Sequence, residues 1–206
     1  MQNEAEKKEV RESERTPARE NREGESKSRK IAYTALLAAL LCVLSPFALP
    51  IGPVPISLGL LAVYIVSSLI GLPYGLAATG IFVALGAIGV PVFTGFTGGF
   101  AKIAGPTGGY IVGYLPCSLI IGLLVDAFEK KLWVYPLAFL AGTAVLYAFG
   151  TAWFMLTAHV KIAHALTVCV LPFLLGDALK MAAASALCYK LRFVLKKTIK
   201  TAKKRL

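Results

Sequence analysis

Asp177 and Lys180 are charged residues three positions apart in a long apolar stretch near the C-terminus. On a helix this spacing places both side chains on one face, where they can pair or share a ligand. A carboxylate accepts two N–H donors and an ammonium donates to a carbonyl, so the pair could hold a neutral urea-like or amide group. Charges within membrane spans are costly and default to functional candidates, although a pair that only fixes helix packing is the alternative.

A second candidate site lies in residues 92–109, which contain six glycines in 18 positions. Gly98, Gly99 and Gly108 bring backbone amides close to any neighbouring ligand, because no Cβ stands in the way. Thr107 and Tyr110 flank the last of these glycines, where a helix is predicted to begin. A tight turn that merely connects two helices is the alternative. No Gly-Lys-Ser or Gly-Lys-Thr occurs, which excludes a nucleotide P-loop.

Other reactive residue types carry weaker signals. Phe93, Phe96 and Phe100 could clamp an apolar ligand, but lone aromatics more often pack. The four cysteines are scattered in apolar runs and are interpreted as small buried hydrophobes. His159 and His164 lack a third ligand nearby, so the sequence predicts no metal site. No catalytic motif indicates an enzyme.

Membrane helices are the elements that must position these residues. The 206-residue chain is 57% hydrophobic and 16% charged, with a mean hydropathy of +0.70, which is too apolar for a water-soluble domain. Residues 1–30 hold nine Lys/Arg and eight Asp/Glu, and residues 190–206 hold eight Lys/Arg. The region between them holds only five Lys/Arg and three Asp/Glu. Because the net charge of +11 sits at the chain ends, nucleic-acid binding is not predicted.

The apolar runs between the charged ends predict an all-α integral membrane bundle rather than a β-barrel. A bilayer core takes roughly 20 helical residues per crossing, so about six crossings fit. The spans are expected at about 31–49, 57–70, 76–88, 110–128, 132–156 and 172–189. Residues 31–191 form this membrane domain, preceded by a charged extension over 1–30 and followed by a basic tail over 192–206. The extension is predicted to be disordered, with an isolated charged helix as the alternative.

Basic flanks orient the bundle, because cytoplasmic loops carry an excess of Lys and Arg. Six crossings place both termini on one side, and the basic C-terminal cluster makes that side cytoplasmic. The proline-rich loop at 50–55, the glycine-rich segment and the polar patch at 159–164 then share the outer face. The sequence therefore predicts a multi-pass protein of the cell membrane with a ligand site that faces outward.

The first span carries a stripe of small side chains, which includes Ala32, Ala35, Ala39 and Cys42. Such a stripe lets another helix approach closely. The approaching helix can belong to this chain or to another subunit.

Four motifs occur in order along the chain: GPVPIS at 52–57, GAIGVPVF at 86–93, GPTGGY at 105–110 and GDALK at 176–180. Together they resemble the BioY family, the biotin-binding S components of energy-coupling factor (ECF) transporters. The resemblance covers about residues 31–191 and leaves the charged N-terminal extension outside it.

The resemblance implies a six-helix protein that holds biotin near the outer surface, under the loop between the first two spans. It assigns Asp177 and Lys180 to the ureido ring, and Thr94 lies where some members supply a polar side chain. Ala35 and Ala39 match the pattern that docks the transmembrane coupling subunit. No cofactor is implied, but concentrative uptake would require that subunit and two ATPases, because the chain has no nucleotide motif.

Two other function classes compete with a substrate-capture protein. A self-sufficient facilitator or channel for a small polar solute would use the same outward cavity and is the alternative. An intramembrane enzyme would need a nucleophile with a base, or a metal set, and the sequence shows neither.

Overall fold

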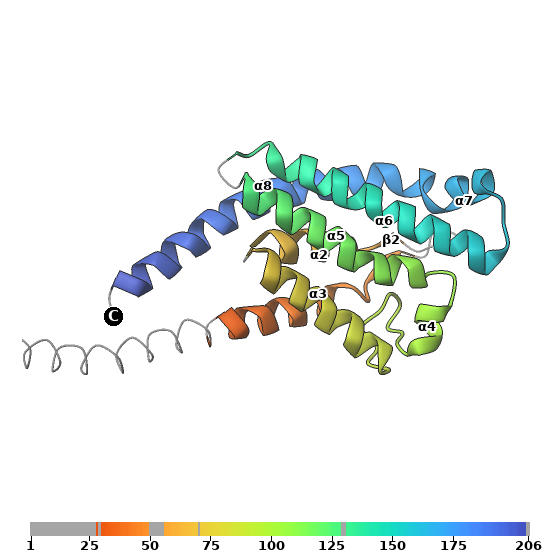
Figure 1. Ribbon diagram of the computed structural model, residues 1–206, viewed down its shortest axis with the longest axis horizontal. Helices are drawn as coiled ribbons and strands as arrows, with labels where there is room; N and C mark the ends of the chain where they lie inside the picture. The colour runs from red at the N-terminus through yellow and green to blue at the C-terminus, as the bar shows by residue number, and fades with distance from the viewer. Residues whose placement is uncertain (1–27, 29, 50–55, 70, 129–130, 205–206) are drawn as a thin grey trace, which may run out of the picture.

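The computed structural model of the chain describes residues 28, 30–49, 56–69, 71–128 and 131–204. Its helices lie side by side in an elongated bundle (Figure 1). The elements in chain order are a first helix Lys30–Leu44, β1 (Ala48–Leu49), β2 (Ile56–Ser57), α2 (Gly59–Leu69), α3 (Leu72–Ala87), α4 (Phe100–Ala104), α5 (Gly108–Ala127), α6 (Val134–Ala158), α7 (Ile162–Cys169) and α8 (Leu171–Lys204).

Among the described residues, three helices are long and apolar enough to cross a membrane, namely α5, α6 and the part of α8 from Leu171 to Arg192. Three further apolar helices are shorter: Lys30–Leu44, α2 and α3. The nearly all-helical membrane fold predicted from the sequence is therefore confirmed. The number of full crossings stays a prediction, since three of the helices fall below the usual crossing length.

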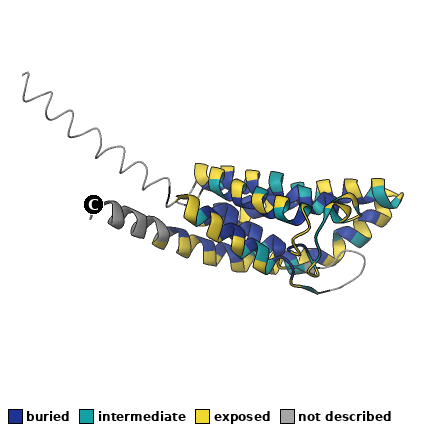
Figure 2. Ribbon diagram, turned by 90° about the horizontal axis from the view of Figure 1, so that it is seen from below, coloured by how far each residue is buried: buried dark blue, intermediate teal, exposed yellow. Residues whose placement is uncertain are grey.

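Helix α5 lies at the centre of the bundle and packs against α6, α3 and α2, while α8 packs against α2 and α6. The Tyr64 and Phe139 rings stack at 4.5 Å between α2 and α6. Leu175 and Leu179 of α8 are 85% and 74% exposed, whereas Asp177 between them is 3% exposed. Apolar side chains outside and polar ones inside suit a lipid environment. Figure 2 shows buried residues where helices face one another and exposed residues along their outer faces.

The two ends of the bundle differ in structure (Figure 1). The first described helix begins, and α8 ends, at the same end of the bundle. The short helices α4 and α7 lie at the opposite end. This arrangement agrees with an even number of crossings, and the assignment of the termini to the cytoplasm stays a prediction.

The first helix is shorter than the sequence predicts, ending at Leu44 rather than near Leu49. Pro46 disfavours the helical conformation of the residue before it, so the helix stops there. Ala48–Leu49 then pairs antiparallel with Ile56–Ser57, a small sheet that an all-α prediction lacks. The proline-rich residues 50–55 and most of the charged N-terminal extension lie outside the described residues.

Two further boundaries differ from the sequence prediction. The glycine-rich segment contains a short helix, α4, and an isolated bridge between Phe93 and Thr97. Helix α8 runs without a break to Lys204, so the predicted boundary between the membrane domain and the basic tail lies inside it. Hydropathy locates the end of an apolar run, but a helix continues into polar sequence wherever helix-forming residues follow.

Candidate functional site

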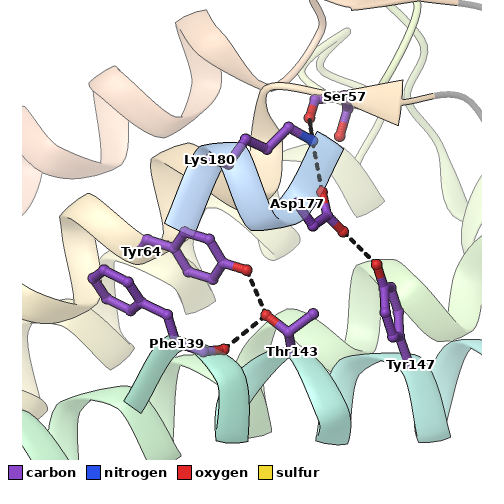
Figure 3. Close-up of polar contacts among 7 residues, drawn as sticks. All are labelled: Ser57, Tyr64, Phe139, Thr143, Tyr147, Asp177 and Lys180. Carbon is purple, nitrogen blue, oxygen red and sulfur yellow. Dashed lines mark hydrogen bonds and ion pairs between the residues drawn. The ribbon is translucent and has the colours of Figure 1, made fainter. Parts of the chain in front are cut away.

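Asp177 and Lys180 form a buried ion pair on α8 (Figure 3). The Lys180 Nζ lies 2.9 Å from the Asp177 Oδ1, and the two side chains are 13% and 4% exposed. Each partner has one further contact: the Lys180 ammonium donates to the Ser57 carbonyl at 2.9 Å, and the Tyr147 hydroxyl donates to the Asp177 Oδ2 at 2.5 Å. The pair thus joins α8 to β2 and α6. The spacing of the two charges in the sequence could not predict these contacts.

The pair keeps unused hydrogen-bonding capacity. A carboxylate offers about four lone-pair sites, and Asp177 uses two of them in the contacts described. An ammonium has three donors, and Lys180 uses two. A group with two adjacent N–H donors and one carbonyl acceptor would satisfy what remains. The site can therefore bind a neutral urea-like group without adding net charge to a buried position.

A second polar network lies deeper in the bundle, one helical turn along α6 from Tyr147 (Figure 3). The Thr143 hydroxyl donates to the Phe139 carbonyl at 2.7 Å and is also hydrogen-bonded to the Tyr64 hydroxyl. Because Thr143 has a single proton and gives it to Phe139, Tyr64 must be the donor to Thr143. This network satisfies the hydroxyls of Tyr64 and Thr143 within the bundle, whereas Asp177 lines the cavity.

A cavity borders the ion pair at the α4 and α7 end of the bundle. Its wall is assembled from nearly every element, since it is lined by Ser45, Ser57, Leu60, Phe82, Phe93, Thr94, Lys102, Thr107, Tyr110, Ile111, Tyr114, Leu146, Tyr147, Cys169, Phe173 and Asp177. Most of these side chains are apolar or aromatic, with a few polar groups among them. This composition is typical of a site for a small organic ligand.

Five of the site residues predicted from the sequence line this cavity: Asp177, Phe93, Thr94, Thr107 and Tyr110. They come from α8, from the loop after α3 and from the start of α5. Lys180 is absent from the lining but contacts Asp177 directly. The structure thus brings together residues that the sequence separates by up to 84 positions, from Phe93 to Asp177.

The three predicted glycines are not among the lining residues. A Cβ on Gly98 would lie 2.3 Å from the Val90 carbonyl oxygen, and one on Gly108 would lie 1.6 Å from that of Ile103. Gly99 has a φ of +97°, which favours glycine. These glycines therefore hold the cavity wall in a tight backbone path, and direct contact of their amides with a ligand stays a prediction.

Several cavity residues escaped sequence analysis, chiefly Tyr147, Tyr114 and Lys102. Tyrosine is common in membrane helices, so Tyr147 carries no local signal that would connect it to Asp177. Lys102 was not among the site residues predicted from the sequence. An unpaired lysine within a glycine-rich segment was the one signal that could have found it.

The predicted partner residues Ala35 and Ala39 are exposed on the first helix, as is Ala32. Leu36 beside them is 66% exposed. Because these small side chains face outward, the stripe is available to a helix outside the described part of this chain. Its role as a partner surface stays a prediction.

Comparison with known proteins agrees with this fold. A family model described as the BioY family matches residues 15–197. The chain is 34% identical over 165 residues to the biotin transporter BioY of Thermotoga maritima, which covers 80% of this chain and 96% of that protein. It is 36% identical over 166 residues to the probable biotin transporter BioY of Pyrococcus horikoshii, covering 81% and 98% of the two chains.

A solved structure is also similar. It is the crystal structure at 2.1 Å of the S-component for biotin from an ECF-type ABC transporter, with a TM-score of 0.76 and 28% sequence identity. The match covers 82% of this chain and 93% of that one. Family model, relatives and fold agree over nearly the whole described bundle, and the protein belongs to the BioY family.

Proposed function

We propose that this protein captures biotin from outside the cell, as the substrate-binding S component of an ECF transporter. The carrying observation is the buried Asp177–Lys180 pair beside the cavity, because its unused donors and acceptors complement a ureido ring. Biotin presents two N–H groups and one carbonyl on that ring. The names of the similar proteins support the same ligand.

The rest of the cavity suits the remainder of such a ligand. The apolar side chains of Leu60, Phe82 and Phe93 line the wall near the polar cluster. Phe93 is 1% exposed and packs edge-on against Phe82 at 5.6 Å. A fixed aromatic wall gives an apolar ring and chain a surface to bury without reorganisation of the protein.

Equilibrium binding of biotin to the purified chain in detergent tests this function. Wild type should bind biotin saturably. Asp177→Asn and Lys180→Ala should each weaken binding at least about tenfold, since each removes charged hydrogen bonds to the ligand. Lys161→Ala is the matched control, because Lys161 is an exposed lysine outside the cavity lining. A folded wild type that does not bind biotin would overturn the proposal.

Energised uptake requires partners, which we propose dock on the first helix. The exposed Ala35 and Ala39 would allow a coupling subunit to approach closely. Replacing both by Trp should abolish co-purification with the coupling and ATPase subunits while biotin binding persists. Leu140→Trp, at a 56% exposed position on α6, is the control and should retain the complex. Intact complexes with the double Trp variant would refute this docking surface.

A further inference from the structure

Lys102 on α4 lines the cavity, and its charge has no counter-ion among the described residues. Its side chain is half-buried, and within the described part of the chain its ammonium has no hydrogen-bond or ion-pair partner. The other cationic group next to the cavity, Lys180, is neutralised by Asp177 at 2.9 Å. The charge of Lys102 is therefore the uncompensated one in this wall.

A half-buried ammonium in a mostly apolar wall favours an anion more strongly than an exposed lysine does, because the local dielectric screens the attraction less. A carboxylate is the natural complement, since charge-assisted hydrogen bonds to carboxylates are among the strong ones. The hydroxyl-bearing side chains of Thr94 and Thr107 line the same cavity and add uncharged polar groups. The carboxylate of Asp177 already has Lys180 and Tyr147 as partners. The ammonium of Lys102 is therefore open to a negatively charged group of the ligand.

We propose that Lys102 binds the carboxylate of the ligand and makes the site select the free acid over its neutral esters and amides. The ligand would then be recognised at two places on different elements: a neutral urea-like group at Asp177 on α8, and an acid group at Lys102 on α4. This inference rests on the proposed function, because it assigns the acid group of biotin to a residue of this cavity.

The test compares biotin with biotin methyl ester and biotin amide, each titrated into the purified full-length chain by calorimetry. The proteins are wild type, Lys102→Met, Lys102→Arg and Lys161→Met. Methionine keeps the length and apolar stem of lysine, and no contact among the described residues is lost with the ammonium. Lys161 precedes α7 at the same end of the bundle but does not line the cavity, so its variant controls for the loss of one positive charge.

Wild type should bind biotin about 10- to 100-fold more tightly than the ester or the amide. Lys102→Met should abolish this preference by weakening biotin alone, while its affinity for the ester stays at the wild-type value. Lys102→Arg and Lys161→Met should keep the preference. Thermal unfolding of each variant verifies that the fold is intact.

Three results would overturn the inference. A wild type that binds acid and ester equally well, or a Lys102→Met variant that keeps the wild-type preference, removes the role of Lys102 while the proposed function stands. Equal weakening of all three ligands in Lys102→Met would show that the residue shapes the cavity and does not bind the acid. A wild type that binds none of the three overturns the proposed function, and this inference with it.

Discussion

The Asp177–Lys180 pair has a counterpart farther along α8, in the pair between Asp126 and Arg192. The Arg192 Nη2 lies 2.5 Å from the Asp126 Oδ1, and the two side chains are 6% and 35% exposed. Arg192 also donates to the Ser68 carbonyl at 2.8 Å, and the Asp126 Oδ2 accepts the Leu72 N–H at 2.7 Å. Asp177 and Arg192 are 15 positions apart on one helix, which corresponds to about 22 Å.

The two pairs use the same chemistry in different surroundings. Asp126 and Arg192 bind backbone groups at the C-terminal end of α2 and at the start of α3, so they connect α8, α5, α2 and α3 at the end where α8 finishes. Neither residue lines the cavity. The Asp177–Lys180 pair borders empty space and retains unused donors and acceptors. We therefore expect the pair beside the cavity to bind the ligand, and the pair without a cavity to hold helices together.

Removing the charges of each pair should give the sharpest contrast. The double variant Asp177→Asn/Lys180→Met should lose biotin affinity by about 1,000-fold, because several charged hydrogen bonds to the ligand disappear together. Asp126→Asn/Arg192→Met should keep the wild-type affinity. Titration calorimetry on folded protein measures both. Comparable losses in the two double variants would erase the distinction between site and brace.

Breaking the brace on one side should mainly reduce stability. Asp126→Asn alone removes the carboxylate that the Arg192 Nη2 contacts, which should lower the free energy of unfolding by about 1 kcal/mol, because the Asp126 side chain is 35% exposed. Adding Arg192→Met should recover part of that loss, since it removes the cost of burying the guanidinium. Denaturant or thermal unfolding in detergent checks the order of the two variants. A double variant less stable than Asp126→Asn would contradict this account.

Biotin itself should stabilise only proteins with an intact Asp177–Lys180 pair. At a free concentration of 100 times Kd, a ligand that binds the folded state alone adds about 2.7 kcal/mol. Wild type and Asp126→Asn should therefore both gain in Tm when biotin is added, each from its own starting value. Asp177→Asn should gain little at the same biotin concentration. An equal gain in all three would show that Asp177 does not contribute to the site.

Tyr147→Phe should have the smallest effect of the series. It removes the hydroxyl that donates to the Asp177 Oδ2 but keeps the ring, so biotin affinity should fall about tenfold. Tyr189→Phe is the matched control, because Tyr189 lies on α8 outside the cavity lining and contacts Tyr135 through its ring. Unchanged affinity in Tyr147→Phe would mean that its hydroxyl only packs beside the carboxylate.

The sequence predicted one of these pairs and missed the other. Asp177 and Lys180 are three positions apart on one helix, so helical periodicity alone places them together. Arg192 stands among the basic residues after Lys190 and was interpreted as part of a cytoplasmic tail, yet its side chain is buried. Its partner is 66 positions away on α5, and no local pattern connects the two.

The cavity shows the same division. Phe93, Thr107 and Tyr110 were found because glycine and proline mark unusual backbone near them, and Thr94 was found through the family resemblance. Tyr147 lies in an ordinary apolar helix and joins the site only because α6 packs beside α8. The β1–β2 pair, whose Ser57 carbonyl accepts from Lys180, was likewise beyond reach, since strands of two residues are too short to show an alternating pattern in the sequence.

The amino-acid sequence by itself determined that this chain is a helical membrane protein with a charged pair in its last apolar helix. Hydropathy and helical spacing are local properties of the sequence. In a bilayer a long apolar run must satisfy its backbone hydrogen bonds internally, so it forms a helix. Tertiary structure decided which of the two ion pairs has a cavity beside it, and which residues complete that cavity. Those contacts join residues up to 124 positions apart, and they arise from the way whole helices pack, which no short stretch of sequence contains.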